Sequence, residues 1–281
     1  MTSLIQAAPA ESRVQAPFGR RAAPVTDVRA VGAYGVISVR DPSGPVPQPG
    51  QFYMLAAVEG WGGREVGRPY LPRACSVARA RGEEEGVGLE FLLEEVGPGT
   101  RVLMSIDPGQ ELWLTGPLGR GFRAPRDGRR ALLVGGGAGV APLIIWQDWL
   151  LAARHRAPAL LGFRDADRAR AAALLTDARV CTDDGSAGHH GPVTDLLRET
   201  LGGVEDVEVS ACGPEPMLAA VRAACRERGV FAQLALEAPM ACGYGACFGC
   251  VVPTVDGYAR VCVEGPVFAA ERLADRYGTD G

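Results

Sequence analysis

Short apolar segments alternate with turn residues between Val25 and about Phe122. Breaks such as Pro49-Gly50 and Pro108-Gly109 separate segments of ordinary strand length. The predicted strands are Val25–Val31, Gly35–Arg40, Gln51–Val58, Ala74–Ala80, Gly88–Leu93 and Gln110–Leu114. Regularly spaced short strands of this kind favour an antiparallel β-barrel.

From Arg130 the pattern changes to strands that alternate with helices. The predicted strands are Ala131–Val134, Pro158–Phe163, Arg179–Thr182, Val207–Ala211 and Phe231–Leu236, and the predicted helices are Ala141–Ala153, Ala166–Leu175, Val193–Leu201 and Glu215–Arg228. This alternation predicts an α/β domain with a doubly wound parallel sheet. The predicted units are a tail over residues 1–23, a barrel over 24–125, the α/β domain over 126–236 and a small cysteine-rich domain over 237–281.

Composition and charge narrow the class of protein. The 281 residues, 47% of them hydrophobic, suffice for two ordinary domains and a small appendage. The net charge of −4 gives no sign of a nucleic-acid or anionic-membrane partner, and no apolar run approaches the length of a membrane span. The first residues show no secretory signal, and Glu11 disfavours a transit peptide, so we expect a flexible tail and a cytoplasmic protein. Eight cysteines in a chain without a secretory signal point to a reducing compartment and to metal binding.

Four of the cysteines form one motif. Cys242, Cys247, Cys250 and Cys262 have the spacing C-x4-C-x2-C-x11-C, with the first three in a glycine-rich loop and the fourth on a predicted strand, Tyr258–Val263. This spacing is close to that of plant-type [2Fe–2S] sites. Glycines in the loop let backbone N–H groups turn inward toward the sulfurs. A structural zinc site usually has two C-x2-C pairs, and disulfides require an oxidising compartment, so the spacing favours the [2Fe–2S] cluster over both alternatives.

Two glycine-bearing turns indicate a nucleotide site in the α/β domain. A strand, a glycine-rich turn and a helix start occur between Leu132 and Pro142, although Val140 stands where the usual dinucleotide motif has its third glycine. An ordinary tight turn is the alternative interpretation of this segment. A second turn, Cys212-Gly213-Pro214, ends a later parallel strand. Because ligands of such sheets bind outside the carboxyl ends of the strands, both turns are expected at one ligand-binding edge.

Two segments of the barrel carry candidate phosphate contacts. In Pro72-Arg73-Ala74-Cys75-Ser76 a guanidinium stands close to a hydroxyl, and arginine suits a pyrophosphate through paired hydrogen bonds. A surface arginine beside a strand is the alternative. The stretch from Gly97 to Thr100 could hold a phosphate at a helix start, or it is a simple turn.

Together these residues resemble the ferredoxin-reductase superfamily. The order Thr182-Asp-Asp-Gly, Cys212-Gly-Pro, Leu236-Glu-x-x-Met240, the cysteine motif and Val261-Cys262-x-x-Gly-Pro is similar to that of the electron-transfer subunits of dihydroorotate dehydrogenase B. The resemblance covers about Val25 to Phe268. It implies an NAD-dependent oxidoreductase whose barrel binds FAD, whose α/β domain binds NAD and whose last domain holds the [2Fe–2S] cluster.

The resemblance also assigns residues to each cofactor. Ser76 would lie near the reactive edge of the flavin and is the candidate catalytic residue. The implied FAD residues are Arg73, Ala74, Cys75, Ser76, Leu92, Leu93, Glu94, Gly99 and Thr100, the expected nucleotide residues are Gly135, Gly136, Gly137, Gly139, Cys212, Gly213 and Pro214, and the metal ligands are Cys242, Cys247, Cys250 and Cys262. Relatives often have proline at the position of Ala74, and an aromatic and a basic residue at those of Leu93 and Glu94.

The implied function is electron transfer in pyrimidine biosynthesis. A partner dihydroorotate dehydrogenase subunit with FMN would supply electrons, which cross the cluster singly and leave through FAD as hydride to NAD+, in a heterotetramer of two copies of each chain. After the second α/β strand, Asp165 would suit the free ribose of NAD and Arg164 the 2′-phosphate of NADP. Two alternatives remain. One is the same module serving a sulfide dehydrogenase, a hydrogenase or a ferredoxin–NADP oxidoreductase, and the other is a zinc-bearing, nucleotide-binding regulatory protein.

Overall fold

The computed structural model describes residues 14–15, 19–63, 66–203 and 206–275. Its N-terminal part is a closed six-stranded barrel with the strand order β1-β2-β5-β4-β3-β6, in which every neighbouring pair is antiparallel. The strands are β1 (Arg21–Val31), β2 (Tyr34–Asp41), β3 (Phe52–Ala57), β4 (Arg73–Gly82), β5 (Val87–Glu94) and β6 (Glu111–Leu118). The short helix α1 (Pro98–Met104) lies between β5 and β6. The predicted barrel and its six strands are therefore confirmed.

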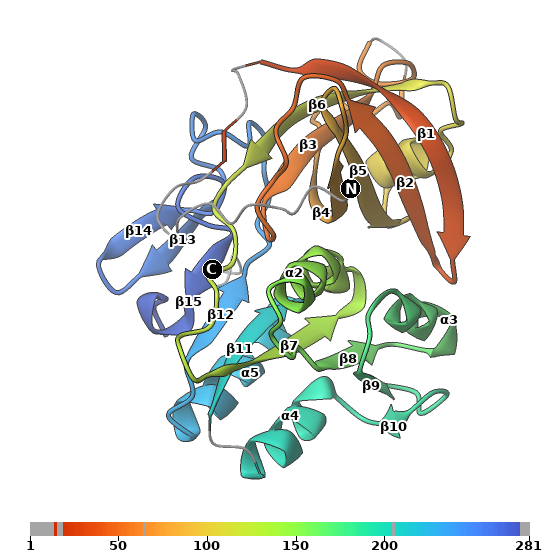
Figure 1. Cartoon of the computed structure of the whole chain (residues 1–281). Helices are drawn as coiled ribbons and strands as arrows, with labels where there is room; N and C mark the ends of the chain where they lie inside the picture. The colour runs from red at the N-terminus through yellow and green to blue at the C-terminus, as the bar shows by residue number, and fades with distance from the viewer. Residues whose placement is uncertain (1–13, 16–18, 64–65, 204–205, 276–281) are drawn as a thin grey trace.

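The second part is a seven-stranded sheet with helices on both faces (Figure 1). The strand order is β10-β9-β8-β7-β11-β12-β15, and all pairs are parallel except β12 with β15. The strands are β7 (Arg130–Gly136), β8 (Ala159–Phe163), β9 (Ala178–Thr182), β10 (His189–His190), β11 (Val207–Cys212) and β12 (Ala232–Ala235). The helices are α2 (Ala141–Ala152), α3 (Ala166–Ala169), α4 (Val193–Gly202) and α5 (Glu215–Glu227), with short 3-10 turns at Gly137–Val140 and Arg170–Leu174.

Two details of the prediction are wrong. The predicted helix Ala166–Leu175 is only the four-residue α3 followed by a 3-10 turn. The chain tightens into the 3-10 turn after α3 and leaves helical geometry at Leu175, whose φ of −114° and ψ of 159° are extended. The predicted strand Tyr258–Val263 ends at Arg260, because the N–H groups of Val263 and Glu264 both donate to the Arg260 carbonyl and close a turn that contains Cys262.

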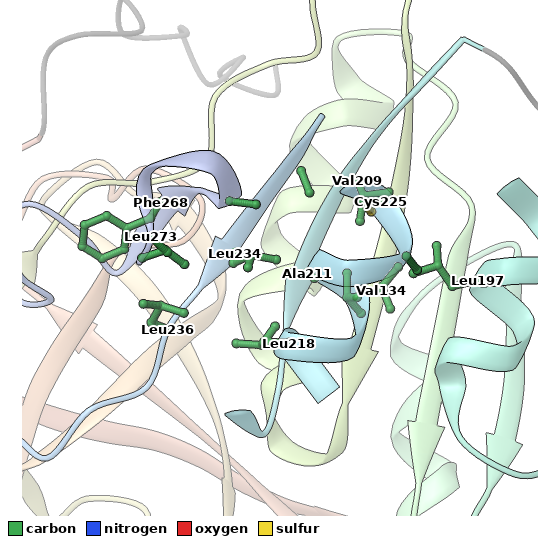
Figure 2. Close-up of a cluster of buried hydrophobic side chains, with 14 of the residues drawn as sticks. Val134, Leu197, Val209, Ala211, Leu218, Cys225, Leu234, Leu236, Phe268 and Leu273 are labelled. Atoms are coloured by element: carbon green, nitrogen blue, oxygen red, sulfur yellow. The ribbon is translucent and has the colours of Figure 1, made fainter. Parts of the chain in front are cut away.

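The C-terminal segment does not stand apart from the α/β domain. Its hairpin of β13 (Val251–Thr254) and β14 (Gly257–Arg260) is followed by β15 (Val267–Ala269), which completes the large sheet, and by a 3-10 turn at Ala270–Arg272. One buried cluster joins Phe268 and Leu273 with Leu234 of β12 and Leu218 of α5 (Figure 2). The cysteine-rich segment is thus fixed by the core of the neighbouring domain.

Most of the predicted tail, residues 1–13 and 16–18, lies outside the described residues, and β1 already begins at Arg21. In the described part of the chain no helix has the length and apolar character to cross a membrane.

Candidate functional site

A cleft of about 750 Å³ lies between the barrel and the α/β domain. Both domains line it, and so do most of the residues that the sequence selected. The predicted residues that line the cleft are Arg73, Ala74, Cys75, Ser76, Leu92, Leu93, Glu94, Thr100, Gly136, Gly137, Gly139 and Pro214. The cleft is of the size of typical cofactor sites, and apolar walls with a few polar groups are typical of such sites.

Four predicted residues do not line the cleft and lie behind its wall: Gly99, Gly135, Cys212 and Gly213. Gly99 packs under Arg73, since a Cβ at Gly99 would lie 2.4 Å from the Arg73 Nε. Gly135 is enclosed by three aliphatic side chains, and Cys212 is buried. Burial raises the pKa of the Cys212 thiol well above its usual value. These residues shape the site from behind.

The two glycine-bearing turns touch each other. A Cβ at Gly139 would lie 2.5 Å from the Cα of Gly213, so only glycine permits this approach of one backbone to the other. Gly137, with a φ of +54°, turns the chain from β7 into the helical segment that leads to α2. The start of such a helix offers backbone N–H groups and a favourable dipole to a pyrophosphate.

Arg73 is held in place on the barrel side. Its Nη1 donates to the carbonyl of Leu71 at 2.6 Å, and its guanidinium carbon lies 5.7 Å from the ring centre of Trp61. Arg73 therefore presents an oriented cation at the cleft edge.

Thr100 stabilises the start of α1, because its hydroxyl accepts hydrogen bonds from the N–H groups of Val96 and Gly97.

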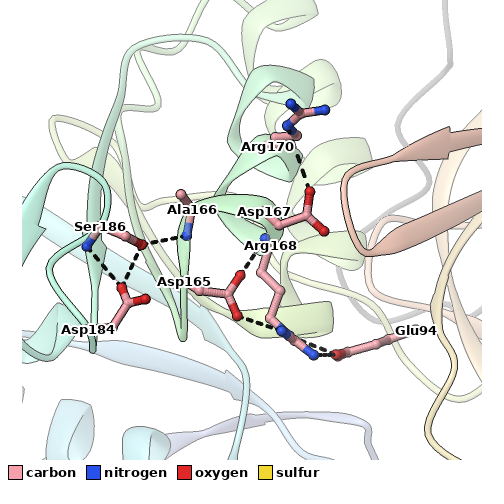
Figure 3. Close-up of polar contacts among 8 residues, drawn as sticks. All are labelled: Glu94, Asp165, Ala166, Asp167, Arg168, Arg170, Asp184 and Ser186. Atoms are coloured by element: carbon pink, nitrogen blue, oxygen red, sulfur yellow. Dashed lines mark hydrogen bonds and ion pairs between the residues drawn. The ribbon is translucent and has the colours of Figure 1, made fainter.

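A bridge of charged groups crosses from the barrel to the α/β domain (Figure 3). Arg168 of α3 reaches Glu94 at the end of β5, with Nε and Nη2 each 2.8 Å from Oε1. Its Nη1 donates to Asp165 at 2.6 Å, and its backbone N–H donates to the same carboxylate, which caps α3, at 2.9 Å. These hydrogen bonds lower the pKa of the Asp165 carboxyl. Arg164 lines the cleft, whereas the carboxylates of Asp165 and Glu94 are engaged by Arg168.

Sequence reasoning missed several cleft residues. Tyr34 of β2 has a buried hydroxyl without a hydrogen-bond partner, and burial raises the pKa of that hydroxyl. Glu237 and Met240 also line the cleft. Solvent reaches Glu237 through the open cleft, yet the atoms packed around its carboxyl raise its pKa by desolvation. The motif Leu236-Glu-x-x-Met240 was the available signal for the last two residues.

The four motif cysteines come together as two pairs. The sulfurs of Cys250 and Cys262 are 3.2 Å apart, and all four thiols are free. That separation exceeds the S–S bond length of about 2.05 Å in a disulfide. On the other side, the N–H of Cys247 donates to the sulfur of Cys242 at 3.4 Å. Cys242 interacts electrostatically with Cys262, so the two pairs are neighbours and all four predicted ligands lie in one site.

Backbone donors surround these sulfurs. The N–H of Gly249 donates to the Cys247 sulfur at 3.4 Å, and the N–H of Cys262 donates to the Cys250 sulfur at 3.5 Å. Burial raises the pKa of Cys242, but N–H groups led by that of Cys247 outweigh it and lower the value to about 6. Such donors stabilise thiolates and tune a bound cluster.

The donor set fits a two-iron cluster. Within the described ranges, no three His, Cys, Asp or Glu side chains surround one point as ligands of a single ion. A cluster with one cysteine pair on each iron suits the observed pairs. The cysteine loop also adjoins the cleft, since Gly243 packs on Met54 and Met240 lines the cleft.

Barrel, nucleotide sheet and cysteine loop together define an iron–sulfur flavoprotein reductase. Residues 237–274 match the iron–sulfur cluster binding domain of dihydroorotate dehydrogenase B. The chain is 37% identical to the dihydroorotate dehydrogenase B (NAD(+)) electron transfer subunit of Caldanaerobacter subterraneus subsp. tengcongensis, over 82% of this chain and 88% of that protein. The subunit of the same name from Clostridium acetobutylicum is 35% identical, over 80% and 86% of the two chains. The chain belongs to this family of electron transfer subunits.

Solved structures agree with that assignment. The NADH-dependent reduced ferredoxin-NADP oxidoreductase matches with a TM-score of 0.76 and 26% identity, over 92% of this chain and 91% of that chain. The ferredoxin reductase of carbazole 1,9a-dioxygenase matches with a TM-score of 0.61 and 25% identity, over 75% and 66% of the two chains. The predicted three-part fold, the oxidoreductase class and the electron-transfer function with FAD, NAD and an iron–sulfur cluster are confirmed.

Proposed function

We propose that this chain passes electrons between an FMN-bearing dihydroorotate dehydrogenase subunit and NAD+, through its four-cysteine site and its interdomain cleft. The contact between these two places carries the proposal. Met240 lines the cleft and precedes the first ligand, Cys242, by only two residues, while Gly243 packs against Met54 of β3. Cofactors held in the two places would be close neighbours, as electron transfer requires.

The two walls of the cleft would bind different cofactors, the barrel wall FAD and the α/β wall NAD(H). On the barrel wall, Arg73 would offer its guanidinium to the pyrophosphate of FAD, and Ser76, which lines the same cleft, would lie near the flavin ring. On the α/β wall, Gly136, Gly137, Gly139 and Pro214 would face NAD(H), and Gly135, Cys212 and Gly213 would support them from behind. FAD, when bound, accepts or gives a hydride and also exchanges single electrons, so it links NAD(H) to a one-electron cluster.

Exposed apolar side chains beside the cysteines offer a docking face for the catalytic subunit. Tyr244 and Phe248 belong to the cysteine loop, and Val255 and Tyr258 to the adjacent β13–β14 hairpin. Their exposed fractions lie between 49% and 79%. Large exposed hydrophobic residues of this kind favour a protein partner. A partner here would bring its cofactor to the exposed Cys247.

The finer assembly also belongs to this proposal. Two copies of each chain would form the complex, and the units 24–125, 126–236 and 237–281 would serve FAD, NAD and the cluster respectively. Eight free cysteines support a reducing compartment, the cytoplasm.

The test is co-expression with a candidate dihydroorotate dehydrogenase catalytic subunit, followed by dihydroorotate-dependent NADH formation. We expect activity only when both chains are present. Cys247→Ser should abolish it while FAD content stays unchanged, because Cys247 belongs to the cysteine site and not to the cleft. Cys225→Ala is the matched control, since this buried cysteine of α5 lies outside the motif.

A complex that holds FAD, FMN and cluster but forms no NADH would overturn the dihydroorotate assignment. Activity of the same preparation with reduced ferredoxin and NADP+ would then favour the reaction that its structural relative is named for. A purified protein without flavin or cluster absorption would instead support the nucleotide-binding zinc protein.

A further inference from the structure

Arg260, the last residue of β14, joins the two segments that carry the motif cysteines. Its Nη1 donates to the carbonyl of Gly245 in the cysteine loop at 3.2 Å, and its guanidinium carbon lies 5.2 Å from the ring centre of Phe248. Its counter-ion is Glu264, with Nη2 and Oε1 2.7 Å apart. The Arg260 N–H donates to the other oxygen of this carboxylate at 2.7 Å.

The carbonyl that Arg260 contacts belongs to a peptide unit aimed at a cluster ligand. The N–H at the other end of this unit is that of Ala246, which lies close enough to the Cys242 sulfur to help lower the pKa of that thiol. A charged donor at the carbonyl polarises the peptide and strengthens its N–H as a donor. Arg260 therefore acts on the Cys242 sulfur through one peptide bond.

The charge of Arg260 also acts directly. The guanidinium lies within Coulombic range of Cys262 and Cys250, the pair at the other end of the site. A one-electron reduction adds a negative charge to a cluster held here. Stronger hydrogen bonds to sulfur and a nearby positive charge both stabilise that reduced form.

We propose that Arg260 is a positioning residue that raises the reduction potential of the cluster, and that Glu264 opposes it by partly neutralising the guanidinium. The proposal rests on the cluster site of the proposed function, and it adds the residues that set how readily that site accepts an electron. Neither residue is a ligand.

The test is a reductive titration of the full chain with its FAD and cluster. The electron paramagnetic resonance signal of the reduced cluster is the readout. Arg260→Gln should lower the midpoint potential and Glu264→Gln should raise it. Each should change the ratio of reduced to oxidised cluster about threefold, or about 28 mV for one electron. Both variants break the same ion pair, so a purely structural role would shift both potentials in one direction.

Three controls sharpen the result. Arg260→Lys keeps the charge and should restore most of the potential. Arg179→Gln and Glu199→Gln each remove one partner of an exposed ion pair between β9 and α4, 2.9 Å apart. Both should leave the midpoint potential of the cluster unchanged. Shifts of one sign, or none, in Arg260→Gln and Glu264→Gln would overturn the proposal.

Cluster loss is read separately from iron and sulfide analysis. If Arg260→Gln loses the cluster, Glu264→Gln still decides, because an unchanged or lowered potential overturns the proposal and a raised one supports it. Wild-type protein without iron and sulfide would overturn the cluster assignment itself, which is a different failure.

Discussion

Arg168 of the α/β domain contacts Glu94 of the barrel with Nε and Oε1 2.8 Å apart, at the border of the cofactor cleft. Both side chains are less than one-third exposed. Partial burial strengthens an ion pair relative to an exposed one, so this contact should help to hold the two domains together. Loss of Arg168 alone would also leave Glu94 and Asp165 unpaired near each other.

A double-mutant cycle of Glu94→Gln and Arg168→Met tests this bridge. We expect a coupling free energy of about 1–3 kcal/mol in urea unfolding at saturating FAD. The control is the pair Arg101–Glu95, which is also close, at 2.7 Å, but whose side chains are 69% and 46% exposed. Its coupling should be about 0.2–1 kcal/mol. A cleft pair that couples no more strongly than the control pair would contradict a role in domain contact.

The contact between the two glycine turns gives a second prediction. Gly139→Ala places a Cβ 2.5 Å from the Cα of Gly213, which is backbone and cannot rotate away. Overpacking of this kind costs about 1–3 kcal/mol. We expect the affinity for ADP-ribose, measured by calorimetry, to fall about tenfold or more, because the turn must move. Cluster absorption should stay unchanged.

Gly202→Ala is the matched control for Gly139→Ala. It lies at the end of α4, where an added Cβ meets no atom within 4 Å. The change should be neutral or stabilise the fold by about 0.4–1 kcal/mol. Equal effects of the two substitutions on ADP-ribose binding would show that the turn contact does not matter.

Local patterns explain why most of the fold was predictable. Along β5 the side chains alternate between buried and half-buried positions at Val87, Gly88, Leu89 and Glu90, which is the signature of a strand with one face in a core. Short apolar runs and glycine turns predict the βα units. The spacing of the four cysteines alone predicted that they form one site, because a metal cluster constrains the chain locally.

Contacts between distant segments were not predictable in the same way. β15 pairs antiparallel with β12, although nothing in Val267–Ala269 specifies its partner. The Arg168–Glu94 bridge joins residues 74 positions apart. Sequence spacing likewise named the ligands but did not show that Cys250 lies against Cys262. Such relationships arise when whole elements pack, and no short window of sequence contains them.

A buried ion pair in the barrel gives the third prediction. Asp41 is fully buried, and Arg21 holds it with Nε to Oδ1 at 2.9 Å while also donating to the Gly116 carbonyl at 2.7 Å. Arg21→Met leaves the carboxylate buried without its partner, which costs about 3–5 kcal/mol. Urea unfolding measures the loss. Arg179→Met, in an exposed pair, should cost no more than about 1 kcal/mol.

The double variant Arg21→Met with Asp41→Leu separates the two explanations for that loss. If the cost comes from an unpaired buried charge, removal of both groups should restore most of the stability. If the double variant stays as unstable as Arg21→Met, the arginine contributes through packing and through its hydrogen bond to the Gly116 carbonyl instead.

The fourth prediction concerns the pH dependence of stability at Glu237. Desolvation raises the pKa of this carboxyl above its ordinary value of 4.5. Between the ordinary and the raised pKa, the folded protein binds more protons than the unfolded chain, so the free energy of unfolding falls as the pH rises through this interval. Glu237→Gln removes this dependence. Near the ordinary pKa, the free energy of unfolding of the variant should match that of the wild type. Above the raised pKa, it should exceed that of the wild type.

Urea unfolding from about pH 5 to about pH 8 measures the difference. Glu199→Gln provides a control of opposite sign, because the hydrogen bond from Arg179 lowers the pKa of Glu199. That group stabilises the fold above its unfolded pKa, so its removal should lower stability at neutral pH and matter less as the pH falls. If the free energy of unfolding of Glu237→Gln depends on pH in the same way as that of the wild type, the Glu237 carboxyl is not desolvated in the folded protein.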